Sequence, residues 1–317
     1  SMKIVFAGTP DFAKQHLEMV LDSKHEIVGV LTQPDRRSGR GKKLQSSAVK
    51  DLALRKGLLV MQPEVLKNDE TVETLTDLNP DIILVVAYGL LVPTDILNIP
   101  KLGCINVHAS LLPRWRGASP MEYAILNGDK EIGVSYMKMS EGLDEGPVYE
   151  MHATDLKEND DLNSAEEKLI NLSRDNLNIF LDNLEEGNAK HFVQDHQKAS
   201  LAPKIVKDLL QIDWAQETAE TIVKKINALG SKYGTYTYLG DKRIKILKAK
   251  VNLSKLDKGP GYIEPSKENL VVQCGKNSSI SIDVIQMQGK NRVSGQEFVS
   301  GYEDLIREHK FFNVAVR

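Results

Sequence analysis

Apolar positions follow a regular alternation over the first half of the chain. Short runs rich in β-branched residues are separated by stretches in which apolar residues recur every three or four positions, the pattern of strands followed by amphipathic helices. We expect strands at 3–7, 26–32, 58–62, 81–87 and 103–108, and helices at 11–21, 46–56 and 69–78. The run 82–87 is apolar at every position, which is typical of a central parallel strand. The pattern therefore predicts an α/β fold with a Rossmann-like, doubly wound and mostly parallel sheet.

The pattern changes in the second half of the chain. A helix at 119–126, strands at 133–139 and 147–154 and a long helix at 162–184 complete the first domain, and the periodicity weakens from about 187 to 208. Beyond it we expect a helix at 216–229, strands at 234–239, 243–251, 261–263, 270–273 and 279–287, and helical turns at 296–301 and 303–309. Many short strands separated by glycines and asparagines predict a small β-barrel. We therefore expect a first domain at 2–188, a linker at 189–207 and a second domain at 208–317.

Composition narrows the class of protein. The 317 residues are 41% hydrophobic and 27% charged, which is ordinary for a globular protein. We find no run of eighteen apolar residues and no signal-peptide layout at the N-terminus. The two cysteines, Cys104 and Cys274, fit a reducing compartment and argue against a disulfide framework or a cysteine-based zinc site. We expect a cytoplasmic protein without a membrane partner or a bound metal, and nothing demands more than a monomer.

Charge is distributed unevenly along the chain. Residues 1–202 hold 22 Lys and Arg against 31 Asp and Glu, a net of −9, whereas residues 203–317 hold 19 against 13, a net of +6. Within the acidic half, positions 36–43 carry five basic residues and no acidic one, namely Arg36, Arg37, Arg40, Lys42 and Lys43. The segment reads as a loop, and its two glycines would let it fold onto a phosphate backbone. A solvated charged loop is the alternative, but the acidic surroundings favour contact with nucleic acid.

Candidate chemistry is concentrated where the strand at 103–108 ends. Asn106 and His108 are two residues apart, so on a strand their side chains share one face. A Pro- and Gly-bearing run follows them, and Asp144 comes between Gly142 and Gly146 about thirty residues later. An amide, an imidazole and a carboxylate together can stabilise an oxyanion and move a proton without a metal. The first strand is followed by Gly8-Thr9-Pro10, which lacks the other glycines of a dinucleotide fingerprint and disfavours NAD or FAD binding.

A set of motifs follows along the chain, namely Gly8–Ala13, Thr32–Arg36 with Gly39–Lys42, Val85–Gly89, Gly103–His108, Ser110–Gly117 and Gly142–Asp144. In this order the motifs closely resemble the methionyl-tRNA formyltransferase family of bacteria and organelles. The resemblance continues through Ala202–Ile205, Ile212–Trp214, Gly289-Lys290 and Phe298, so it covers essentially the whole chain. Several enzymes that use 10-formyltetrahydrofolate share the Asn, His and Asp set, whereas the Gln-Pro-Asp-Arg segment and the second domain point to the tRNA enzyme.

The resemblance implies a Rossmann-like catalytic domain and a C-terminal barrel of the oligonucleotide/oligosaccharide-binding type that contacts tRNA. It implies transfer of a formyl group from the co-substrate 10-formyltetrahydrofolate to the α-amino group of methionyl initiator tRNA. The catalytic set would be Asn106, His108 and Asp144. Two stretches would bind folate, Tyr88 and Gly89 in one and Ser110, Leu111, Leu112 and Pro113 in the other. The basic segment around Arg40 would contact the acceptor stem.

Three other functions are compatible with parts of this pattern. A formyltransferase that acts on a nucleotide-sugar amine or on glycinamide ribonucleotide would keep the catalytic set but would not need the basic segment. A folate-dependent hydrolase that releases formate would use the same three residues with water as the acceptor. A non-catalytic RNA-binding protein would have no need of Asn106, His108 and Asp144.

Overall fold

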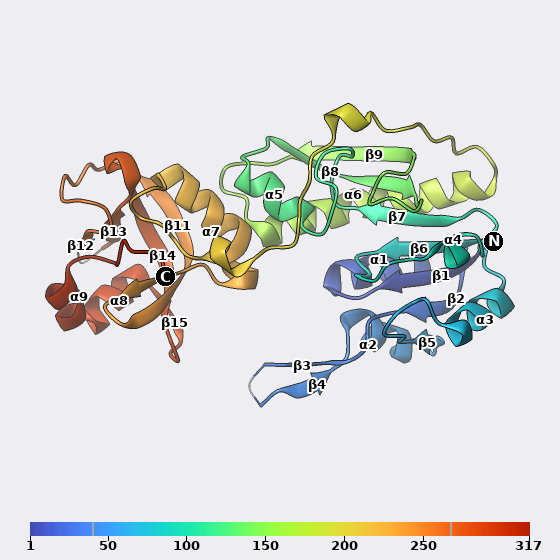
Figure 1. Cartoon of the computed structure of the whole chain (residues 1–317), viewed down its shortest axis with the longest axis horizontal. Helices are drawn as coiled ribbons and strands as arrows, with labels where there is room; N and C mark the ends of the chain where they lie inside the picture. The colour runs from blue at the N-terminus through green and yellow to red at the C-terminus, as the bar shows by residue number, and fades with distance from the viewer. Residues whose placement is uncertain (40, 267) are drawn as a thin grey trace. The chain divides into compact units, whose positions relative to one another are not determined.

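The computed structural model describes residues 1–39, 41–266 and 268–317, and the chain forms two compact units. The first unit contains residues 1–120, 131–155 and 166–203, and the second contains residues 121–130, 156–165 and 204–317. Both are visible in Figure 1 as separate groups of helices and strands. Among the described residues, no helix has the length and apolar character needed to cross a membrane.

A seven-stranded sheet forms the centre of the first unit, in the order β5-β2-β1-β6-β7-β8-β9. Its strands are β1 (Lys3–Gly8), β2 (Glu26–Leu31), β5 (Val60–Met61), β6 (Ile82–Val86), β7 (Cys104–His108), β8 (Glu131–Lys138) and β9 (Val148–Asp155). The first five are parallel to one another, and β8 and β9 are added by antiparallel pairing. The predicted doubly wound, mostly parallel sheet is therefore confirmed. The strand order reverses between β1 and β6, the place where open α/β sheets bind ligands beyond the carboxyl ends of their strands.

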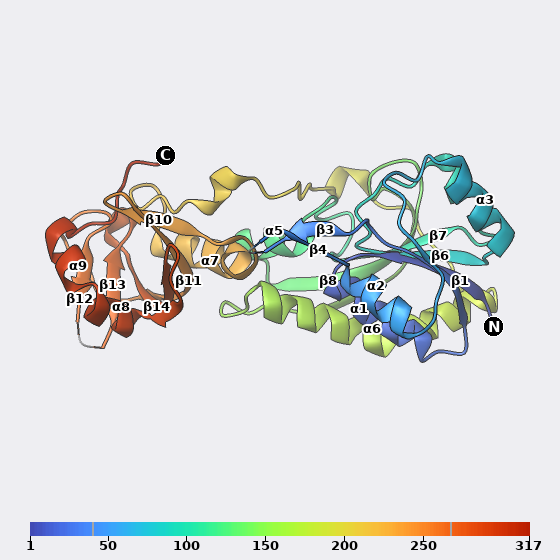
Figure 2. The same cartoon turned by 90° about the horizontal axis from the view of Figure 1, so that it is seen from below.

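Helices cover both faces of this sheet. They are α1 (Asp11–Leu21), α2 (Ala48–Arg55), α3 (Asp69–Leu78), α4 (Thr94–Leu97) and α6 (Leu162–Glu185). Figure 2 shows α1 and α6 on one face and α3 on the other. Side-chain caps start two of these helices, because Ser47 accepts from the Lys50 N–H and Asn68 from the Thr71 N–H. On the α3 face, Leu75 packs in one core cluster with Val5 and Val85 of the central strands.

The basic segment is a β-hairpin and not the loop that its composition suggested. Strand β3 (Arg36–Ser38) pairs antiparallel with β4 (Lys43–Gln45), and every described residue from 36 to 45 is exposed. The prediction of a loop was wrong because the two strands bury no apolar face, so no hydrophobic alternation marks them. Arg40, which the sequence placed at the centre of this segment, lies outside the described residues.

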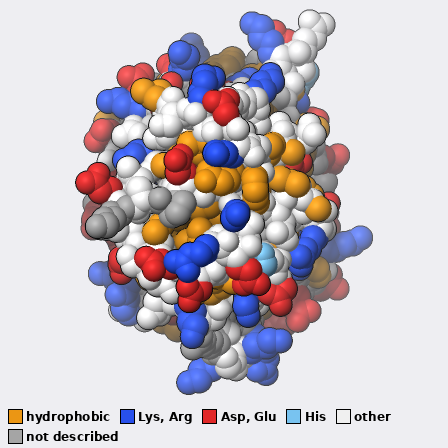
Figure 3. All heavy atoms as spheres, turned by 90° about the vertical axis from the view of Figure 1, so that its left-hand side faces the viewer, with side chains coloured by type: hydrophobic (Ala, Val, Ile, Leu, Met, Phe, Trp, Pro, Cys, Tyr) orange, Lys and Arg blue, Asp and Glu red, His pale blue; other side chains and the backbone are white. Residues whose placement is uncertain are grey.

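The second unit is an antiparallel half-barrel with flanking helices, which matches the predicted class. Its strands are β10 (Tyr236–Leu239), β11 (Lys242–Asn252), β12 (Ile263–Pro265), β13 (Leu270–Gln273), β14 (Ser279–Met287) and β15 (Arg292–Ser294). The helices α5 (Pro120–Leu126), α7 (Ala219–Tyr233), α8 (Gly295–Gly301) and α9 (Glu303–His309) belong to the same unit. In its core the Trp214 indole stacks on Phe312 with ring centroids 5.4 Å apart. Figure 3 shows one face of this end of the chain, where apolar side chains are surrounded by charges of both signs.

Candidate active site

Strand β7 places Asn106 and His108 on one face at the carboxyl edge of the sheet. Asn106 stands opposite Val85 of the parallel neighbour β6 and opposite Met137 of the antiparallel neighbour β8. His108 is two residues further on and only 6% exposed. Within the described residues, no hydrogen bond reaches the Asn106 side chain, which leaves its amide available to a ligand.

The imidazole of His108 is held from two sides. Its Nε2–H donates to the carbonyl oxygen of Trp115 at 2.9 Å, and its Nδ1 faces Oδ2 of Asp144 at 3.7 Å. Because a carbonyl can only accept, the contact with Trp115 assigns a proton to Nε2. Nδ1 is therefore the nitrogen that can exchange a proton on the side of Asp144.

Asp144 reaches the site from the loop between β8 and β9. Its backbone is left-handed, with φ of 50°, a conformation that residues other than glycine seldom adopt. Its Oδ2 accepts a hydrogen bond from the backbone N–H of Gly117 at 2.8 Å. Gly117 has φ of 116°, and a Cβ atom there would lie 2.7 Å from the carbonyl oxygen of Ala202, so only glycine fits this close approach. The structure thus brings the three predicted catalytic side chains together.

The loop after β7 carries the second predicted group, residues 110–113, and is fastened to the sheet by Ser135. The Ser135 hydroxyl, which is fully buried on β8, donates to the Ser110 carbonyl at 2.6 Å and accepts from the Leu112 N–H at 3.1 Å. Leu112 packs with Met137 in a small buried cluster. Ser110 itself donates to the carbonyl of Arg114. Ser135 was not predicted from the sequence, because a lone serine inside an apolar strand carries no signal of its partners.

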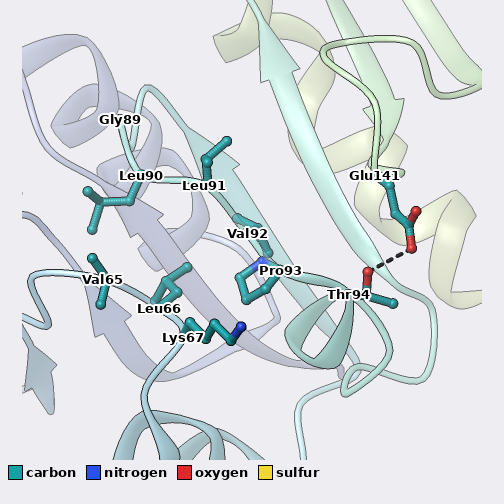
Figure 4. Close-up of a pocket in the computed structure, with 10 residues that line it drawn as sticks. All are labelled: Val65, Leu66, Lys67, Gly89, Leu90, Leu91, Val92, Pro93, Thr94 and Glu141. Atoms are coloured by element: carbon teal, nitrogen blue, oxygen red, sulfur yellow. Dashed lines mark hydrogen bonds between the residues drawn. The ribbon is translucent and has the colours of Figure 1, made fainter.

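A pocket of about 730 Å³ opens beyond the carboxyl end of β6. It is lined by Val65, Leu66, Lys67, Gly89, Leu90, Leu91, Val92, Pro93, Thr94 and Glu141 (Figure 4). Its walls are mostly apolar, and the Glu141 carboxylate accepts a hydrogen bond from the Thr94 hydroxyl at 2.7 Å. Its volume lies within the range of about 300–1,000 Å³ that is usual for small-molecule sites. The pocket is therefore a mostly apolar candidate binding site at the carboxyl edge of the sheet.

The predicted folate residues have different positions around this pocket. Gly89 lines it, whereas Leu111 and Leu112 are not part of its described lining. The Tyr88 ring belongs to the core cluster behind it, and its hydroxyl has no hydrogen-bond partner among the described residues. Burial raises the pKa of that phenol well above its ordinary value. The backbone carbonyl of Tyr88 accepts hydrogen bonds from the Thr9 hydroxyl and the Gln33 amide.

Polar contacts anchor the base of the basic hairpin to α2 and to the residue that follows β5. Lys50 Nζ forms an ion pair with Asp35 at 3.0 Å, and Gln62 donates to the same carboxylate at 2.8 Å. The hydrogen bond from Gln62 and then the Lys50 ammonium lower the pKa of Asp35. Gln33 accepts from Arg36 and donates to the Tyr88 carbonyl at 2.8 Å. The first residue of the hairpin is therefore linked to the segment that enters the pocket.

The predicted basic residues begin at this anchor with Arg36 and continue along the exposed hairpin. Arg36, Arg37, Lys42 and Lys43 are all exposed on the hairpin. Arg37 donates to the Lys42 carbonyl at 3.1 Å, so part of its donor capacity stabilises the hairpin itself. In the described part of the chain, no group of three or more His, Cys, Asp or Glu side chains is gathered to hold a metal.

Comparisons of the sequence with known proteins identify the family to which the chain belongs. Residues 2–178 match the model of formyl transferases, and residues 204–303 match that of the formyl transferase C-terminal domain. A methionyl-tRNA formyltransferase of Idiomarina loihiensis is 43% identical over 310 residues, which are 96% of this chain and 98% of that protein. One from Caldanaerobacter subterraneus subsp. tengcongensis is 41% identical over 302 residues, 95% of this chain and 97% of that protein.

Solved structures share the fold at low sequence identity. HypX from Aquifex aeolicus in complex with tetrahydrofolic acid superposes with a TM-score of 0.67 at 18% identity, over 96% of this chain and 48% of that one. An N-formyltransferase from Helicobacter canadensis, in complex with folinic acid and dTDP-3-aminofucose, has a TM-score of 0.66 at 18% identity, over 90% of this chain and all of that one. At this identity the likeness concerns the fold alone. Because the relatives named above match over nearly their whole length, the chain belongs to the methionyl-tRNA formyltransferase family.

Proposed function

We propose that this protein transfers the formyl group of 10-formyltetrahydrofolate to the α-amino group of methionyl initiator tRNA, with Asn106, His108 and Asp144 as catalytic residues. The observation that carries the assignment is the gathering of these three side chains at the carboxyl edge of β7. Membership of the family supports the reaction, and the geometry supports the roles of the residues.

The pocket fits the co-substrate in size and character. A pterin is a flat heteroaromatic ring, which apolar walls can cover, and a carboxylate such as Glu141 can accept hydrogen bonds from its N–H groups. We place the pterin between Gly89–Val92 and Glu141, with Ser110–Pro113 beside the reacting end. The bound folate supplies the electrophilic formyl carbon.

Each catalytic residue has a separate task in this proposal. The Asn106 amide donates a hydrogen bond to the formyl oxygen as negative charge develops there, in the manner of an oxyanion hole. Asp144 accepts the proton that the attacking amine loses, either directly, through a water or through Nδ1 of His108. The tetrahedral intermediate then collapses, the bond between the formyl carbon and N10 of the folate breaks, and the same proton passes to N10 as tetrahydrofolate leaves. The contact of Nε2 with Trp115 keeps the imidazole in the orientation that this transfer needs.

The finer features of the substrate complex are also part of the proposal. The basic hairpin contacts phosphates of the acceptor stem, because it presents Arg36, Arg37, Lys42 and Lys43 to solvent at the same edge as the pocket. The second unit, with its net positive charge, contributes further phosphate contacts. We expect the protein to act as a monomer in the cytoplasm.

A direct assay tests the function. The protein is incubated with 10-formyltetrahydrofolate labelled in the formyl group and with charged initiator methionyl-tRNA, charged elongator methionyl-tRNA or uncharged initiator tRNA. We expect label on the charged initiator tRNA alone or in large excess. Label on neither charged tRNA would overturn the function, and release of labelled formate without any acceptor would identify a hydrolase.

A further inference from the structure

The side chain of Gln194 contacts the loop that carries the Asp144 carboxylate. No motif in the sequence indicated these contacts. It follows α6 in a segment without strand or helix, and its side chain is buried, only 4% exposed, although its neighbours Val193 and Asp195 are exposed. Its Nε2 donates to the carbonyl oxygen of Asp144 at 2.9 Å and to that of Gly146 at 2.7 Å. Both hydrogens of the amide are therefore used on the loop that carries Asp144.

The other end of the same amide is also occupied. Gln194 Oε1 accepts from Arg116 Nη2 at 2.9 Å and from Arg116 Nε at 3.3 Å. The Arg116 guanidinium is itself buried and donates to His196 Nδ1 at 2.8 Å. Gln194 thus connects the loop around Asp144 to the segment 115–117.

These two segments are the ones that hold the catalytic side chains. Within residues 115–117, the Trp115 carbonyl accepts from His108, and the Gly117 N–H donates to Asp144 Oδ2. The Asp144 backbone adopts a left-handed conformation, which still costs free energy in a residue other than glycine, and neighbouring contacts stabilise it. Gln194 supplies the contact to the Asp144 backbone itself.

We propose that Gln194 is a positioning residue for formyl transfer, which holds the Asp144 loop against the Arg116 segment so that the carboxylate stays between Gly117 and His108. The inference rests on the proposed function, because it assigns Gln194 a role in the same reaction. Gln194 acts through Asp144, and it therefore affects the chemical step more than the binding of either substrate.

Two substitutions separate the interactions of this amide. Gln194→Glu keeps the size and the acceptor for Arg116 but removes both donors to the carbonyls, whereas Gln194→Met keeps the length and removes all polar interactions. We expect kcat to fall about 10- to 100-fold in both variants, because a displacement of about 1 Å of a catalytic group can cost a factor of that order. KM for each substrate should change less than about threefold. The matched control is Gln197→Met, an exposed glutamine three residues away.

A double-mutant cycle with Asp144→Asn gives the readout that a merely structural role would not produce. If Gln194 acts through the carboxylate, Gln194→Met should lower kcat by less than about twofold in the Asp144→Asn background. An equal loss in both backgrounds, or a loss expressed mainly in KM, would overturn the inference. Retention of full kcat by Gln194→Glu would overturn it as well.

Hydrogen exchange tests the same inference without an assay of activity. The Gly117 N–H is protected by the Asp144 carboxylate, so its exchange should accelerate at least about tenfold in Gln194→Glu and stay unchanged in Gln197→Met. Unchanged exchange in Gln194→Glu would contradict the positioning role. If the wild type does not formylate methionyl-tRNA, the proposed function fails, and this exchange experiment still decides the role of Gln194.

Discussion

The three side chains that we propose to be catalytic differ in how firmly the surrounding residues hold them. His108 donates to the Trp115 carbonyl and faces Asp144 at 3.7 Å, and Asp144 accepts a hydrogen bond from the Gly117 N–H. Asn106 makes no side-chain hydrogen bond to any described residue. The free amide is thus suited to a substrate atom, whereas the two bound groups are prepared for proton transfer.

Loss of the Asn106 donor should affect the chemical step. We expect Asn106→Ala to lower kcat by about a hundredfold or more, which is the usual loss when one oxyanion donor is removed. KM for folate should change little, because the pocket beyond β6 stays intact. Single-turnover rates at saturating concentrations of both substrates measure the effect.

The matched control for this variant is Asn188→Ala, which removes an exposed amide that donates to Glu186. It should retain the wild-type rate. A near-normal rate for Asn106→Ala would remove this residue from the catalytic set.

At the scale of single residues, the sequence predicted the pair on β7 from local geometry. A separation of two positions places Asn106 and His108 on one face of any strand. The role of Asp144 was reached through the family resemblance, since its left-handed backbone and its contact with Gly117 depend on the folded chain. Gln194 carried no signal, because an isolated glutamine in an aperiodic segment looks like any surface residue.

Among the secondary-structure elements, the hairpin β3–β4 combines an exposed basic surface with an anchored base. It presents a row of basic side chains to solvent, and its base is fixed by the ion pair of Asp35 with Lys50. A rigid base and an exposed basic arm reduce the ordering cost when the arm meets a phosphate backbone. The composition predicted the charge of this element, whereas its pairing appeared only in the structure.

Charge removal on the hairpin should change the salt dependence of tRNA binding. We expect Lys42→Gln/Lys43→Gln to weaken tRNA binding and to reduce the slope of log K against log salt concentration by about one unit for each phosphate that the hairpin no longer neutralises. Folate binding should be unaffected. Titrations of labelled tRNA at several salt concentrations measure the slope.

The control is Lys3→Gln/Lys56→Gln, which also removes two exposed positive charges. Lys3 begins β1 and Lys56 follows α2, so both lie away from the carboxyl edge of the sheet. Its salt slope should equal that of the wild type. If the hairpin variant keeps the same slope as this control, the hairpin does not contact phosphates.

In the whole molecule, each unit encloses one cysteine. Cys104 is buried in a core cluster of the first unit and Cys274 in the core of the second. Burial raises the pKa of each thiol to about 12. Each thiol therefore reports on the integrity of its own unit.

The reactivity of these thiols should follow unfolding. At pH 8 a pKa of about 12 leaves about one thiol in 10⁴ ionised, so a thiol-specific disulfide reagent should not modify the native protein. Both thiols should react in denaturant. In Cys104→Ala the remaining thiol reports on the second unit, and in Cys274→Ala it reports on the first, so titration with denaturant gives an unfolding midpoint for each unit. Rapid modification of the native protein would contradict this description of the cores.

The sequence alone determined the features that depend on local periodicity. Apolar alternation and helical spacing located nearly every strand and helix, including α1, α3 and α9 at their observed bounds, because these elements bury a regular stripe or face. It missed the short elements α4 and β15, and it failed at β3 and β4, which bury no such face. The motifs in their order were specific enough to indicate the family.

Only the tertiary structure decided which distant segments meet. Backbone carbonyls and N–H groups join residues 108, 115–117, 144 and 194. Every residue carries such groups, so a single sequence does not reveal which of them will pair. The pocket beyond β6 is lined by residues 65–67, 89–94 and 141, which follow β5, β6 and β8, and no local pattern encodes that these segments meet. The sequence therefore predicted the type of reaction, whereas only the folded structure showed the contacts that hold the proposed catalytic groups in place.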